Sequence, residues 1–132
     1  MTKHPQSGSV LLEALISILI FAFGVLGLFG MQAVAMKNMS QSNYRATAVY
    51  MASQLIGRAQ GDINHLADYQ YTSGTANAKV DPWMAEVTAA LPKAGATVTV
   101  DGVNSTLTVT VSWNAPGDPV SHSHTVSTYV SY

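Results

Sequence analysis

A long uncharged segment lies near the start of the chain. From Ala14 to Met36, twenty-three residues follow one another without a charge, and most of them are apolar. As an α-helix rising about 1.5 Å per residue, this segment would be about 35 Å long, enough to cross the hydrocarbon core of a bilayer. We therefore predict a helix here that lies in lipid or among partner helices.

The helix is predicted to continue beyond this segment as an amphipathic helix. Apolar residues recur there at steps of three and four and form one stripe, which consists of Tyr44, Ala48, Met51, Leu55 and Ala59. This spacing is typical of a helix with one face against a core. From Ser9 to Gln60 the helix would be about 78 Å long. A domain of this size cannot bury such a helix over its whole length.

The second half of the chain changes from a helical to an alternating pattern. Residues 62–80 show no clear period and are predicted to be a loop, with Asp62 near the end of the long helix. Asp81 and Pro82 predict the N-cap and the first residue of a short helix, which Pro92 stops. Thr or Ser alternates with apolar residues in 96–100 and 106–113, and 120–132 is predicted to be a third strand.

These patterns predict an α+β fold. The Asp101–Gly102 dipeptide and the Pro- and Gly-containing segment 114–119 are turn signals, so the three strands should form an antiparallel meander. The apolar face of this sheet needs a cover. We expect the stripe on the long N-terminal helix to pack on this small antiparallel sheet.

Composition excludes several kinds of function. Beyond Ala59 the chain has two basic residues, Lys79 and Lys93, against six acidic ones, so it lacks the basic patch that nucleic-acid binding requires. It has no cysteine, which excludes disulfides, thiol catalysis and thiolate metal sites. We find no catalytic motif and expect neither enzymatic activity nor a cofactor.

Glu13 is the most unusual residue, because it follows only three apolar residues into the apolar segment and has no cation beside it. A carboxylate within a membrane span is costly and is commonly functional. Cleavage after Gly8 would create a positive partner, since a new α-amine at Ser9 has a pKa of about 8. That amine could pair with Glu13 of its own chain or of a neighbour. The alternative is an interfacial residue or a charge that interacts with the helix dipole.

The segment Gly8-Ser9-Val10-Leu11-Leu12-Glu13, followed by the apolar run, resembles the class III signal of type IV prepilins. The resemblance implies that prepilin peptidase cuts after Gly8 and methylates the new N-terminus. It also implies that Glu13, fifth after the cut, guides the subunit into the filament. The residue after the cut is usually Phe, and here it is Ser9, so N-methylation of Ser9 is left open.

Further segments resemble the PilV family of minor pilins. They are the stretch from Gly24 to Gln32, the Trp83 and Leu91-Pro92 pattern, and the alternating segments 97–100 and 107–113. Within the first of these, Gly24, Gly27 and Gly30 would let helices approach closely or bend locally. The alternative is that glycine is simply common in membrane helices.

The resemblance divides the chain into four parts. These are a leader at 1–8, a transmembrane and filament-core helix at 9–35, the amphipathic second half of the helix at 36–61, and a small periplasmic α+β domain at 62–132. A single-pass protein of the bacterial inner membrane is implied, later part of a pilus on the cell surface. Lys3 favours a cytoplasmic N-terminus, whereas Lys37 and Arg45 weaken that argument.

The implied function is structural. Such a minor pilin would support pilus assembly and priming, and hence twitching motility or adhesion. Its implied partners are prepilin peptidase, the major pilin, other minor pilins and the inner-membrane assembly platform. Two alternatives are a pseudopilin of a type II secretion system and an uncleaved, signal-anchored periplasmic binding domain.

Two other sets of residues are candidates for binding. His122 and His124 lie two apart on one strand, where two imidazoles could share a metal, but no third ligand is evident in the sequence. We expect them to be polar residues of an edge strand. Trp83 and Trp113 could form a ligand platform, and we expect them instead to belong to the core.

Overall fold

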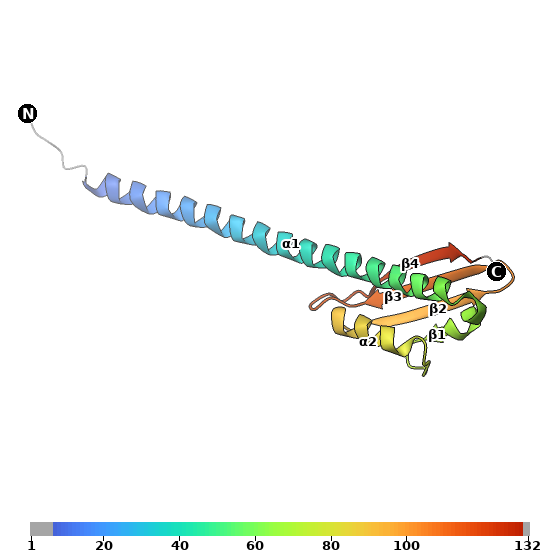
Figure 1. The fold of residues 1–132 in the computed structure, drawn as a ribbon. Helices are drawn as coiled ribbons and strands as arrows, with labels where there is room; N and C mark the ends of the chain where they lie inside the picture. Colours follow the sequence, from blue (N-terminus) through green and yellow to red (C-terminus); the bar gives the residue numbers. More distant parts are fainter. Residues whose placement is uncertain (1–6, 131–132) are drawn as a thin grey trace, which may run out of the picture. The chain divides into compact units, whose positions relative to one another are not determined.

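The computed structural model describes residues 7–130. Its longest element is helix α1, Ser7–Gly61, which confirms the long helix predicted from the sequence (Figure 1). The chain divides into two units, one of residues up to Met39 and one from Ser40 onward, and α1 contributes to both. The predicted leader at 1–8 falls mostly outside the described residues.

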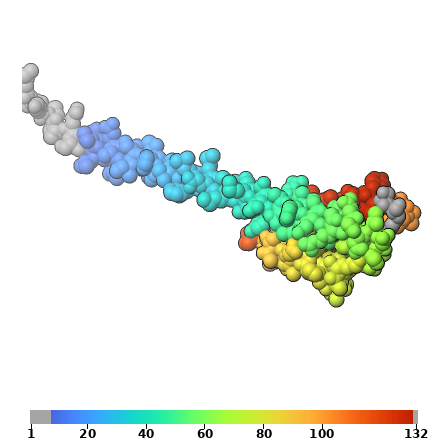
Figure 2. All heavy atoms as spheres, viewed as in Figure 1, coloured from blue at the N-terminus to red at the C-terminus, as the bar shows by residue number. Residues whose placement is uncertain are grey.

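The described part of the first unit is helical throughout and contains no other element. Its large apolar side chains are exposed, apart from the partly buried Val25, and their exposed fractions run from 49% for Ile16 to 75% for Met39. Figure 2 shows this stretch from blue to cyan. Within residues 7–130, no side chain covers this stretch of helix, as expected from its predicted length.

The second unit contains a four-stranded antiparallel sheet in the order β1-β2-β3-β4. The strands are β1 Tyr71–Thr72, β2 Gly95–Asp101, β3 Thr106–Trp113 and β4 His122–Tyr129. The last three form the predicted meander, and every β3 residue pairs with a β4 residue. The fold class is therefore α+β, as predicted.

The prediction of a loop at 62–80 was wrong in part. This segment contains a 3₁₀ helix, η1 Ile63–Tyr69, and the short strand β1, which pairs Tyr71 with Val98. A 3₁₀ helix lacks the 3.6-residue period, and two residues are too few to show alternation. The segment nevertheless contributes buried side chains to the core, from Leu66, Tyr69 and Tyr71.

The core lies between one face of the sheet and two helices. The predicted stripe of α1 packs there, with Ala48, Leu55 and Ala59 fully buried and Tyr44 and Met51 partly buried. Helix α2, Asp81–Ala90, packs against the same core (Figure 1). The opposite sheet face presents Thr and Ser side chains to solvent, as the strict alternation predicts.

The ends of α2 agree with the sequence in one respect and differ in another. The helix ends at Ala90, with Leu91 as its C-cap, just before Pro92, as predicted. The N-cap is Val80 rather than Asp81, which is the first helical residue. The Asp81 carboxylate instead accepts a 3.0 Å hydrogen bond from the backbone N–H of Asn77. That bond fixes the loop before the helix.

The connection between β2 and β3 is a turn at the Asp101–Gly102 signal, as predicted, and it is longer than a two-residue hairpin loop. Asp101 pairs with Thr106, which leaves four residues in the loop. The left-handed residue of this loop is Ser105, with φ 49°, and not Gly102. Asp101 accepts hydrogen bonds from the side chain and backbone of Asn104 and from the backbone of Val103, and these lower the pKa of its carboxyl. The aspartate thus organises the loop.

Candidate functional site

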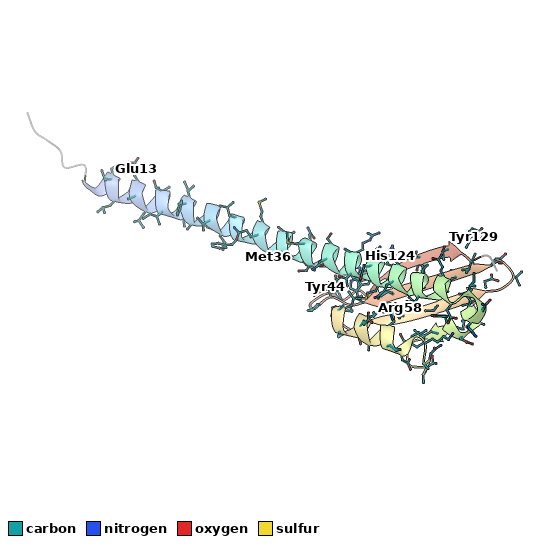
Figure 3. The ribbon with its side chains drawn as sticks, viewed as in Figure 1. Glu13, Met36, Tyr44, Arg58, His124 and Tyr129 are labelled. Atoms are coloured by element: carbon teal, nitrogen blue, oxygen red, sulfur yellow. The ribbon has the colours of Figure 1, made fainter. Side chains whose placement is uncertain are left out.

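The structure places Glu13 in the second turn of α1, exposed among exposed apolar side chains (Figure 3). Its neighbours Leu12 and Leu15 are 61% and 66% exposed. Within residues 7–130, no side chain forms an ion pair or hydrogen bond with Glu13. The carboxylate is therefore available to a group from outside the described chain.

Ser9 and Glu13 lie four residues apart in the same helix. Residues at this spacing share a face and are separated by about 6 Å along the axis. A positive group at residue 9 would therefore lie within one turn of the Glu13 carboxylate. The predicted roles of Gly8, Ser9 and Glu13 in processing and assembly stay predictions.

The three glycines of the apolar segment lie within an uninterrupted stretch of α1. A Cβ atom built at Gly24, Gly27 or Gly30 would meet nothing within 4 Å. No contact within the described chain therefore requires glycine at these positions. Close packing against another helix, or local bending, stays a prediction for them.

Helix α1 is long and apolar enough to cross a membrane, by length and composition, and it is the one such helix in the described residues. No part of its most apolar window is buried within the chain. This separates the N-terminal apolar part of α1 from the core helix of a globular domain, which buries its apolar face.

The two histidines of β4 lie on the strand face that points toward the core side. His122 Nε2 is 3.1 Å from a carboxylate oxygen of Asp118, which also accepts a 2.7 Å hydrogen bond from Gln41. The His122 ring also stacks on Trp113, with centroids 6.0 Å apart. No group of three His, Cys, Asp or Glu in residues 7–130 could hold a metal. His122 is thus a hydrogen-bonded residue of an edge strand, as expected.

Both tryptophans belong to the core, as predicted. Trp83 is 0% exposed and Trp113 is 4% exposed. Neither therefore offers an open aromatic surface to a ligand.

One polar cluster was missed by the sequence analysis. The Asp62 carboxylate accepts a hydrogen bond from Lys79 and lies 2.8 Å from His65 Nδ1. These contacts, with that of Lys79 the larger, lower the pKa of Asp62, and the same bond raises the pKa of Lys79. Burial raises the pKa of Tyr69, whose hydroxyl donates to Asp62 at 3.4 Å.

This cluster connects the end of α1 to the segment before α2. A ring contact adds to it, since Lys79 Nζ lies 5.3 Å from the centroid of the Tyr69 ring. The only sequence signal is an aspartate at the predicted helix end. Asp62 and Lys79 are too far apart along the chain for a local rule to pair them.

Comparison of the chain with protein-family models, with curated proteins and with solved structures returned no match.

Proposed function

We propose that this protein is a minor pilin of the type IV pilus, anchored in the inner membrane by α1 and later packed into a filament through the same helix. One observation carries the proposal. Apart from the partly buried Val25, the apolar side chains of α1 from Val10 to Met36 are exposed, and one carboxylate, Glu13, lies near their start.

An exposed apolar helix of this length needs a cover. Burial of apolar surface is worth about 25 cal/mol per Å², and soluble monomers rarely expose patches larger than a few hundred Å². Lipid supplies the cover before assembly, and neighbouring helices supply it afterwards. The exposed glycines Gly24, Gly27 and Gly30 suit both states, because small residues let helices approach closely.

The proposal also gives Glu13 a purpose. A charge at the centre of a bilayer costs about 2.5–3.5 kcal/mol on insertion scales. Cleavage after Gly8 turns Ser9 into a cationic N-terminus one helical turn away. Pairing between Glu13 of one subunit and the amine of another would offset the cost and set the axial register of the two helices.

Prepilin peptidase would process the chain, and the unit from Ser40 onward would lie in the periplasm before assembly. The partners in the filament would be the major pilin and other minor pilins, joined at the inner-membrane assembly platform. In this role the protein would prime assembly and so support twitching motility or adhesion.

The decisive experiment is the intact mass of the protein extracted from membranes. The proposal requires a chain that begins at Ser9, with or without an added methyl group. A Gly8→Val variant should stay at full length and outside pili. Gly24→Val is the matched control, since it also replaces an exposed glycine of α1 where a Cβ meets nothing within 4 Å. It should be processed normally.

A wild-type chain that keeps Met1 at steady state would contradict the proposal and indicate a signal-anchored domain. Deletion of the gene, scored for surface pili and for secreted enzymes, separates the two filament systems. Loss of secretion with normal pili would assign the chain to a type II secretion pseudopilus instead.

A further inference from the structure

Strand β4 forms one edge of the sheet. Within residues 7–130 it pairs with β3 alone, in a register that runs unbroken from His122 to Tyr129. Figure 1 shows it as the last arrow of the sheet. One side of a regular eight-residue strand is therefore left without a strand neighbour.

The register identifies the backbone groups on this free side. The N–H of Val130 donates to the carbonyl of Ser105 at 2.8 Å, which extends the β3–β4 pairing by one residue. Because hydrogen-bonded and non-bonded pairs alternate along antiparallel strands, every second residue of β4 directs its N–H and C=O away from β3. Ser123, Thr125 and Ser127 are such residues.

The free edge lacks the features that usually prevent strand addition. Exposed edges are commonly protected by Lys, Pro, bulges or very short strands. β4 contains no Lys, Arg, Asp, Glu or Pro, and its pairing with β3 has no bulge.

The opposite edge of the same sheet is protected. Strand β1 has only two residues. Just beyond it, the backbone N–H of Ser73 donates to the carbonyl of Ala96 at 3.0 Å, and the Ser73 hydroxyl accepts a hydrogen bond from the N–H of Ala96 at 2.6 Å, so a side chain completes the pairing where β1 ends. The contrast between the two edges identifies β4 as the side open to a partner.

We propose that the free edge of β4 binds a β-strand of a neighbouring, different pilin-like subunit in the same filament, through backbone hydrogen bonds. The inference rests on the proposed function, which supplies the neighbour. The edge also sets the chemistry of the partner strand. It should carry uncharged, hydroxyl-bearing side chains on the face shared with Thr125 and small apolar side chains on the face shared with Val126.

A different subunit fits this edge better than a second copy of the chain. Antiparallel pairing of β4 with another β4 would create a twofold axis and reverse one domain relative to the other. The stretch of α1 within each domain, residues 40–61, would then run in opposite directions. Subunits anchored in one membrane and packed into one filament share one direction.

The test uses the full-length chain in the cells that make it. Ser127→Pro removes one outward N–H, a change that edge strands tolerate, whereas Ser127→Ala keeps this N–H and removes only the hydroxyl that contacts Thr108. The proline variant should be processed and inserted in the membrane but incorporated about tenfold less, which corresponds to about 1.4 kcal/mol. The alanine variant should be incorporated like wild type.

Two lysine substitutions distinguish a contact at the edge of the sheet from a contact on its outer face. Ser127 and Thr99 are both exposed, and both pair with Thr108 across the same row. Thr99 lies on the interior strand β2. Ser127→Lys should reduce incorporation, and Thr99→Lys should not. Equal losses would place the contact on the face and overturn the edge pairing.

Photocrosslinking identifies the occupant. Tyr129 at the end of β4 is 81% exposed, so p-benzoylphenylalanine can replace it (Figure 3). Tyr50 on α1 is 63% exposed and gives a second position for the probe. The probe at Tyr129 should crosslink to another pilin-like subunit, and Ser127→Pro should abolish the product. A product with twice the mass of this chain would overturn the choice of a different subunit, and the absence of any product in assembled filaments would overturn the proposal.

The outcomes also separate this inference from the proposed function. If wild-type protein is neither cleaved after Gly8 nor incorporated, the proposed function fails. If wild type and Ser127→Pro are both cleaved and incorporated to the same level, the proposed function stands and the edge pairing fails.

Discussion

The indole N–H of Trp83 on α2 donates a 2.9 Å hydrogen bond to the backbone carbonyl of Met51 on α1. Trp83 is completely buried, and Met51 is partly buried, so this bond is largely shielded from solvent. It joins the two helices that cover the sheet. The Arg58–Glu86 ion pair at 3.0 Å joins the same helices at the surface, where both side chains are exposed and contribute little.

Because Trp83 forms this hydrogen bond, replacing it by Phe should lower the free energy of unfolding more than the same replacement at Trp113. Trp83→Phe removes a buried hydrogen bond as well as volume, and should lower the free energy of unfolding by about 2 kcal/mol. Trp113→Phe removes an indole N–H that is buried without a hydrogen-bond partner in residues 7–130. Its cost should be about 1 kcal/mol smaller. Urea unfolding of the detergent-solubilised chain measures both, and a larger cost at Trp113 would contradict the assignment.

The Asp62–Lys79 pair predicts a dependence of stability on pH. Folding lowers the pKa of Asp62 below its usual 3.8, mainly through the hydrogen bond from Lys79. Such a group stabilises the fold above its unfolded pKa, and the effect is lost as the pH falls through the folded pKa. Asp62→Asn should therefore be less stable than wild type at pH 7, with a difference that shrinks below about pH 4.

Asp68→Asn is the control for this prediction. The Asp68 carboxylate lies 3.5 Å from Lys79 Nζ, and its side chain is 58% exposed against 35% for Asp62. Its loss should cost less at every pH. Thermal unfolding of the three proteins from pH 3 to pH 8 gives the comparison, and parallel curves for wild type and Asp62→Asn would contradict the assigned ion pair.

The elements of this fold that repeat a pattern were predictable from the sequence. The stripe from Tyr44 to Ala59 and the alternation from Thr106 to Trp113 each repeat over enough residues to exclude another structure. The segment 62–80 could not be predicted in the same way. Its 3₁₀ helix and two-residue strand are stabilised by contacts with distant residues, such as the pairing of Tyr71 with Val98.

The candidate site also has a part that the sequence shows and a part that only the structure shows. Glu13 stands out in the sequence because it interrupts an apolar run, and the structure adds that no described residue pairs with it. The edge position of β4 was expected from the sequence, because β4 is the last strand of the predicted meander. The contrast with the other edge could not be inferred, because that edge is the two-residue strand β1, which is too short to show alternation.

The loop between β2 and β3 predicts where glycine matters. Ser105 has φ 49°, a left-handed conformation that costs a non-glycine residue about 1 kcal/mol. Ser105→Gly should therefore stabilise the second unit by up to about 1 kcal/mol. Gly102→Ala should not destabilise this unit, because a Cβ there meets nothing within 4 Å and φ at Gly102 is not positive. A lower unfolding temperature for Gly102→Ala would contradict the observed loop.

Glu13 provides the sharpest test of how subunits would enter the filament. Glu13→Ala removes the carboxylate and leaves a helix that is more apolar, so membrane insertion should be equal or better. The proposed cleavage site at Gly8 is unchanged. The variant should therefore be cut to begin at Ser9 and accumulate in the inner membrane, while the amount in sheared pili falls about tenfold or more, as expected for a lost charge pair of about 1.4 kcal/mol or more.

Leu12→Ala is the matched control, since it shortens an adjacent exposed side chain without changing charge. It should be incorporated nearly as well as wild type. If Glu13→Ala matches Leu12→Ala in sheared pili, pairing between Glu13 and a neighbour's amine is not required for incorporation. Glu13 would then pair only with the N-terminal amine of its own chain, which lies within one helical turn, while the subunit is anchored in the membrane. Acetylation of the Ser9 amine separates these cases, because it should slow incorporation only if the amine pairs with the neighbour's Glu13.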